Sequence, residues 1–155
     1  MDKDHHDHFL NGAIFEVYDK TAKSYVTTLV SGQLMIVGND ANEEYEISKN
    51  EDFTKIIKTV KTDENKQIIL DIEDGTYYSR KVGDDKVSKH VIKDGKAVLV
   101  DAIYGHEYEF KEIKAPTSYQ LADKSKAYKV EADKDTDTII YYFENARIVV
   151  PNTGV

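Results

Sequence analysis

Short runs of alternating apolar and polar residues, separated by turn residues, extend through most of this chain. In residues 10–19, LNGAIFEVYD, one side of an extended strand would carry Ala13, Phe15 and Val17. Side chains alternate between the two faces of a strand, so this pattern predicts a strand with one buried face. Further runs predict strands at residues 25–30, 33–37, 127–132 and 138–150. We therefore expect an all-β fold, an antiparallel sandwich of short strands.

One stretch in the middle of the chain follows a different pattern. In residues 50–60, NEDFTKIIKTV, the apolar residues fall at a spacing typical of a helix, namely Phe53, Ile56, Ile57 and Val60. Ser48 or Asn50 would cap its first turn, because their side-chain oxygens accept hydrogen bonds from the free N–H groups there. The sequence therefore predicts one short helix among the strands.

The length and charge of the chain limit the classes of protein to consider. A chain of 155 residues is long enough for one domain with a true core. Its formal net charge of -8 disfavours binding to nucleic acid. Cysteine is absent, which excludes disulfides, thiolate catalysis and cysteine-based zinc sites. The sequence contains no apolar run long enough to span a membrane.

A carboxylic acid lies on the apolar side of a predicted strand. In residues 108–119, YEFKEIKAPTSY, Glu112 falls in step with Tyr108 and Phe110. An unpaired buried charge costs several kcal/mol or keeps the group protonated, so this acid needs a partner. In the last predicted strand, Asn145 is in step with the apolar residues in the same way. A protonated carboxyl and a carboxamide can satisfy each other by hydrogen bonding.

A nearby lysine would give the same pair a chemical role. A desolvated amine loses its proton more easily and becomes a nucleophile. It could attack the amide carbon of Asn145, while Glu112 shuttles protons and polarises the carbonyl group. The product would be an isopeptide crosslink. From these residues alone, a structural hydrogen bond and a crosslink both remain open.

Three stretches together resemble the B-type (CnaB, or SpaA-like) domains of Gram-positive pilins and surface adhesins. Residues 108–119 are similar to the E-box of that family, residues 10–19 to its opening L-x-G-A strand, and residues 143–145, FEN, to its closing strand. The resemblance implies an immunoglobulin-like, transthyretin-like sandwich over residues 1–147. The segment from about 25 to 91 exceeds what such a domain needs, so we interpret it as an insertion that holds the short helix.

The resemblance also implies roles for individual residues. Glu112 would assist formation of a bond between Asn145 and a lysine of the first strand. Lys3 is the only lysine ahead of that strand and is our candidate. The family's K-x-D pattern, matched on Asp2, would instead place the reactive lysine upstream of Met1, and both alternatives stay open. In either case the resemblance implies a stalk or pilin domain that a covalent bond makes rigid.

The last residues, VVPNTGV, resemble a sortase sorting signal of the L-P-x-T-G kind. The motif comprises Val150, in place of leucine, followed by Pro151, Asn152, Thr153 and Gly154. The resemblance implies cleavage between Thr153 and Gly154 by a sortase, with transfer of the Thr153 carbonyl to an amine. That amine would belong to the cell wall or to a neighbouring pilin. We therefore expect a secreted protein at the cell wall or pilus surface of a Gram-positive bacterium.

Two other functions compete with a stalk domain. An adhesin module would bind a host protein or glycan through the segment from about 25 to 91. A metal enzyme would use residues 4–8, DHHDH, which have metal-ligand side chains, but a polar leader before a strand is the simpler interpretation. No catalytic triad or phosphate-binding loop is evident. We expect no metal, no cofactor, and no enzyme activity beyond autocatalytic crosslinking.

Overall fold

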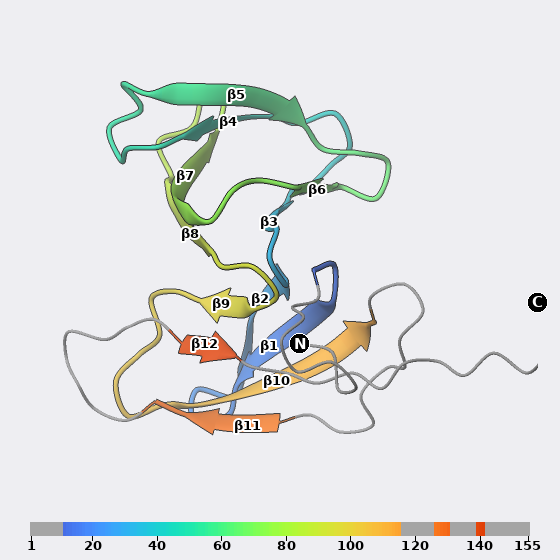
Figure 1. Ribbon diagram of the computed structural model, residues 1–155, viewed down its shortest axis with the longest axis vertical. Helices are drawn as coiled ribbons and strands as arrows, with labels where there is room; N and C mark the ends of the chain where they lie inside the picture. The colour runs from blue at the N-terminus through green and yellow to red at the C-terminus, as the bar shows by residue number, and fades with distance from the viewer. Residues whose placement is uncertain (1–10, 116–125, 131–138, 142–155) are drawn as a thin grey trace, which may run out of the picture.

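The computed structural model describes residues 11–115, 126–130 and 139–141, and within these ranges it contains twelve strands and no helix (Figure 1). The strands are β1 (Ile14–Asp19), β2 (Ser24–Val30), β3 (Leu34–Val37), β4 (Glu44–Ser48), β5 (Ile56–Lys61), β6 (Gln67–Leu70), β7 (Gly75–Lys81), β8 (Ser88–Ile92), β9 (Ala97–Leu99), β10 (Glu107–Lys114), β11 (Lys126–Lys129) and β12 (Ile139–Tyr141). All pairings are antiparallel, which confirms the predicted all-β sandwich.

The strands form two halves. In Figure 1, strands β3 to β8 make the upper half, and the remaining strands make the lower half. The lower half contains a four-stranded sheet of order β11-β10-β1-β2 and a two-stranded sheet of β12 and β9. The upper half contains a four-stranded sheet of order β5-β4-β7-β8 and a two-stranded sheet of β3 and β6. Each half therefore has one large and one small sheet.

The first core lies in the lower half and follows the predicted alternation. Phe15 of β1 pairs with Glu112 of β10, and Val17 pairs with Phe110, so these side chains share one face of the sheet. Strand β9 covers this face with Ala97 and Leu99. The cluster comprises Ala13, Phe15, Val17, Ala97, Leu99, Ala102, Tyr108, Phe110 and Val130. Burial of this apolar face against β9 is the driving force for the sandwich.

The second core lies between the sheets of the upper half. Leu34 of β3 pairs with Leu70 of β6, and Ile36 pairs with Ile68. Their apolar face packs against Ile47 from β4. The buried members are Leu34, Ile36, Ile47, Ile68, Tyr77 and Ile92. That this half is an insertion into the first stays a prediction.

The helix predicted over residues 50–60 is wrong, because this segment forms a turn and an edge strand. Phe53 has a φ of 58°, in the left-handed region that a right-handed helix excludes. Asn50 closes the turn, since its Oδ1 accepts the Lys55 N–H at 3.0 Å. Strand β5 then leaves Ile56 and Ile57 each 43% exposed, whereas Phe53 is 6% exposed. A helix would have put all three on the same buried side.

A close contact joins the two halves at the turns between them. Asn11, just before β1, accepts the Gly95 N–H on its Oδ1 at 2.7 Å and donates from Nδ2 to Asp94 at 2.9 Å. Gly32, between β2 and β3, lies so close that an added Cβ would sit 1.8 Å from the Asn11 Oδ1. Gly32 also has a φ of 65°. Both facts require glycine at this crossing.

Candidate functional site

Glu112 points into the first core, as the alternation of its strand predicted. Glu112 is only 4% exposed, and it pairs across the sheet with Phe15. Phe110 lies on the same face two residues earlier in β10 and is also buried. Glu112 therefore shares the buried face of the sheet with Phe15 and Phe110.

The chain enters β1 at the end of the sandwich where Glu112 lies. Ala13 precedes Phe15, the partner of Glu112, and its N–H donates to the buried Ser31 Oγ at 3.0 Å. The Ser31 N–H in turn donates to the Ala13 carbonyl at 2.9 Å. These bonds hold the start of β1 against the end of β2. Residues 11–13, just ahead of β1, therefore lie at this end of the first core.

Strand β12 ends toward the same end of the sandwich. Gly32, which follows β2 there, donates its N–H to the Lys96 carbonyl at 3.0 Å. The next residue, Ala97, pairs with Tyr141, the last residue of β12. Strand β12 thus runs from the far end of β9 toward the Glu112 end, as its arrow in Figure 1 indicates. The start of β1 and the end of β12 therefore both lie toward the end of the sandwich where Glu112 lies.

A second buried acid lies at the opposite end of β1. Asp19 is 3% exposed, and its Oδ1 accepts the N–H groups of Thr21 and Ala22 at 3.0 Å each. Its Oδ2 lies 2.7 Å from His106 Nδ1. Burial would raise the pKa of the Asp19 carboxyl, but the hydrogen bonds from Ala22 and His106 outweigh it, so the pKa is lowered. Sequence reasoning missed this acid, although it is in step with Phe15.

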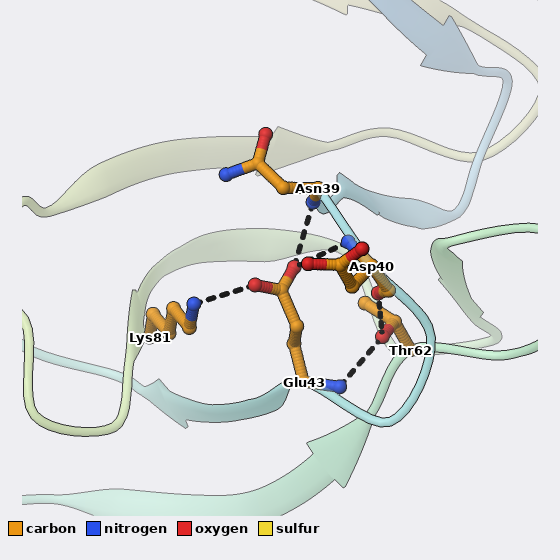
Figure 2. Close-up of polar contacts among 5 residues, drawn as sticks. All are labelled: Asn39, Asp40, Glu43, Thr62 and Lys81. Carbon is orange, nitrogen blue, oxygen red and sulfur yellow. Dashed lines mark hydrogen bonds and ion pairs between the residues drawn. The ribbon is translucent and has the colours of Figure 1, made fainter.

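A third acid, Glu43, forms an ion pair in the upper half (Figure 2). Its Oε2 lies 2.5 Å from Lys81 Nζ, and its Oε1 accepts the N–H groups of Asn39 and Asp40 at 2.6 and 3.1 Å. Thr62 Oγ1 accepts the Glu43 N–H and donates to the Asp40 carbonyl. The hydrogen bond from Lys81 is the largest cause that lowers the pKa of Glu43 to about 2. Glu43 is therefore a charged structural group that closes the β3–β4 loop.

The family model for the SpaA prealbumin-like fold domain matches residues 1–147. The chain belongs to this family. The resemblance inferred from the three sequence motifs is thereby confirmed. Comparison with curated proteins and with solved structures gave no match. SpaA domains are typical of surface pilins, so the family indicates a pilin or surface-adhesin domain with an extracellular location.

Several of the predicted functional residues of this SpaA domain lie outside the residues that the structure describes. Lys3, Asn145, residues 4–8 and the sorting motif at 150–154 all lie outside the described ranges. Their roles, and that of Glu112 in a crosslink, stay predictions. Within residues 11–115, 126–130 and 139–141, no group of three or more acidic or histidine side chains could hold a metal ion. In the same ranges, no helix is long and apolar enough to cross a membrane.

Proposed function

We propose that this SpaA domain is a sortase-anchored stalk or pilin domain that an autocatalytic Lys-Asn isopeptide bond makes rigid. The observation that carries the proposal is the placement of Glu112. It is buried among Phe15 and Phe110, at the end of the sandwich where β1 begins and β12 points. A lysine ahead of β1 and Asn145, four residues after β12, would have to meet near this acid.

The reaction joins an amine to a carboxamide and releases ammonia. The neutral lysine Nζ attacks the Asn145 Cγ, and Glu112 donates a proton to the developing tetrahedral group. The Glu112 carboxylate takes a proton from the lysine nitrogen and passes it to the original amide nitrogen, which leaves as ammonia when its C–N bond breaks. The tetrahedral oxygen returns its proton to Glu112 as the carbonyl group re-forms. Glu112 ends the cycle protonated, as it began. The apolar surroundings favour this chemistry, because they disfavour the charged forms of both amine and acid.

A crosslink between the first and last strands would suit a protein under tension. Force applied to the two ends of the domain would load a covalent bond, and the sandwich between them would not unzip. The bond would also restrict the unfolded chain, as a disulfide does. By that analogy a loop of nearly the whole domain gives a stabilisation of about 4 kcal/mol. Cysteine is absent, so no disulfide can serve this purpose.

Intact mass spectrometry of the purified chain tests the crosslink. We expect the wild type to lack the mass of one ammonia and Glu112→Gln to have its full mass. Glu109→Gln is the matched control, because Glu109 lies on β10 but is only half-buried and contacts Lys20. This variant should lose ammonia as the wild type does. Peptide mapping then tests whether the joined residues are Lys3 and Asn145.

A second experiment tests the alternative in which the reactive lysine lies upstream of Met1. In that case the chain keeps its full mass but forms a covalent adduct with an added peptide that carries a K-x-D strand. The adduct should be lost in Glu112→Gln and in Asn145→Ala. A full mass combined with no adduct would overturn the proposed crosslink.

Sortase anchoring is tested separately. Incubation with a sortase and triglycine should cleave the chain after Thr153 and attach the triglycine amine to its carbonyl. The variant Gly154→Ala should be a poorer substrate, because the motif's glycine follows the cleaved bond. A chain that stays intact with sortases of several specificities would contradict anchoring through this motif, and the crosslink proposal would be unaffected.

Adhesion is a second candidate function. The specific observation that favours it is a groove of about 630 Å³ between the two halves, lined by residues 26–30 and 86–92 among others, which could receive part of a host protein. A host glycan would be an alternative ligand of such a module.

A further inference from the structure

A groove of about 630 Å³ lies between the two halves of the described structure. One wall consists of residues 26–30 of β2, and the other consists of residues 86–92, which include β8. Residues 35–37 of β3 also line it, as do residues 98–101, which comprise the end of β9 and the two residues after it. The groove therefore follows the line along which the upper and lower sheets approach each other.

The pattern of lining residues shows that the groove follows strand edges. Successive side chains of a strand point to opposite faces, so a cavity over one face contacts only every second residue. This groove instead contacts every residue from 26 to 30 and from 86 to 92. It must run beside the backbones of β2 and β8. Both are the terminal strands of their four-stranded sheets.

The β8 edge is open along most of its length. Strand β8 pairs with β7 on one side, where Tyr77 lies opposite His90. On its other side, a single bridge between Lys93 and Lys96 closes the turn into β9, and β9 then departs to pair with β12. Among the described residues, no strand pairs with the β8 edge from Ser88 to Val91. Such an edge offers a row of N–H and C=O groups to another chain.

We propose that this groove binds an extended peptide segment of a partner protein, which adds to β8 as a fifth strand of the β5-β4-β7-β8 sheet. Strand addition supplies affinity through main-chain hydrogen bonds and specificity through pockets for alternate side chains. The inference does not rest on the crosslink or on the anchoring described above.

The lining of the groove indicates the chemistry of the peptide. Its apolar lining includes Leu29, Ile36, Val98 and Leu99, which suit apolar side chains at every second position. His90 adds no charge at neutral pH, because burial lowers its pKa to about 4, and its Nε2 lies 2.7 Å from Ser79 Oγ. The side chain of every second peptide residue can therefore enter the apolar part of the groove, beside a neutral His90.

The charges along β8 favour a peptide with acidic residues. Lys86 and Lys89 line the groove and form no ion pair within the described residues, whereas Lys81 is paired with Glu43. Two acids also line the groove. Asp84 accepts the Lys86 N–H, and Asp101 follows β9 on the other side. Among the described residues, Lys86 and Lys89 thus leave two cations without an ion pair on the β8 side of the groove, with which acidic peptide residues can pair.

A synthetic peptide with the sequence Glu-Val-Thr-Val-Glu-Val-Glu tests the proposal on the wild-type protein. Two derivatives carry N-methyl groups on alternate residues, one set on each edge of the extended peptide. An added strand uses the N–H groups of one edge only. We expect one derivative to bind as the parent does and the other to lose at least about tenfold in affinity, measured by fluorescence anisotropy. Equal binding of both derivatives would overturn strand addition, as would no binding of the parent at millimolar concentration.

Amide hydrogen exchange identifies the strand that receives the peptide. Peptide binding should slow exchange in residues 88–91, and protection at β5 or β2 without β8 would overturn the assignment. Replacing both Lys86 and Lys89 by Glu should weaken binding about tenfold or more. Lys58→Glu on the β5 edge is the matched control and should bind normally. Dimerisation of the protein alone that protects β8 would also overturn the proposal, because a second copy would then be the occupant.

Discussion

One acid from each half of the molecule shows how different the surroundings of a carboxyl group can be. In the lower half, Glu112 lies among aromatic side chains of the core, opposite Phe15. In the upper half, Glu43 lies against Lys81 and two backbone N–H groups, and its pKa is lowered to about 2. The hydrogen bonds and the lysine around Glu43 favour its charged form, whereas Glu112 lies on the apolar face of the first core. Neighbouring groups, and not burial alone, decide whether an acid is held as a charged group.

The largest expected loss of stability comes from a change to the apolar surroundings of Glu112. Phe110→Ala removes a fully buried ring beside Glu112 and should lower the free energy of unfolding by about 3–5 kcal/mol. Urea denaturation measures it. Ile113→Ala is the control on the same strand, because Ile113 is 41% exposed and should cost far less. Equal losses for the two variants would contradict the assigned faces of β10.

A smaller effect is expected at Asp19, the acid held by hydrogen bonds at the other end of β1. Asp19→Ala leaves the N–H groups of Thr21 and Ala22 without their acceptor and should cost about 1–3 kcal/mol. Because folding lowers the pKa of Asp19, its contribution is present above the unfolded pKa and is lost as pH falls through the folded pKa. The variant should therefore lose stability at neutral pH and show a weaker acid dependence. An unchanged acid profile would contradict this role.

The ion pair of the upper half should contribute less, because the Lys81 side chain is 42% exposed and solvent screens the charge. Glu43 has a lower pKa in the folded state than in the unfolded state, so its contribution is present above pH 4.5 and is lost as pH falls toward about 2. Glu43→Gln should remove stability at neutral pH and flatten the stability profile in that window. Thermal unfolding across pH measures both. Lys81→Gln should give a similar loss, and the double variant should lose little more.

The smallest expected change in stability tests whether residues 50–60 end in an edge strand and not in a helix. Ile57→Thr keeps a β-branched side chain at an exposed position of β5 and should change the free energy of unfolding by no more than about 0.5 kcal/mol. Phe53→Ala, in the same segment, should cost several times as much because Phe53 is buried. A large loss for Ile57→Thr would indicate that this side of β5 is covered.

Much of the lower half could be predicted from local patterns. The alternation in β1 and β10 predicted which of their side chains are buried, including Glu112, because strand geometry alone assigns the faces. The helix over residues 50–60 failed because the spacing of apolar residues cannot show that Phe53 adopts a left-handed backbone conformation. Lys3, Asn145 and the sorting motif remain predictions from the resemblance.

The sequence by itself determined the strand class of the chain and the direction in which Glu112 points, since each depends on residues close together in the chain. Three short motifs were enough to indicate the family. Only the tertiary structure decided which distant groups meet. Glu43 and Lys81 are 38 residues apart, and Asp19 and His106 are 87 residues apart. The groove beside β8 likewise exists only because two sheets approach there. Local periodicity carries no information about such contacts, because they depend on how the strands are ordered and packed.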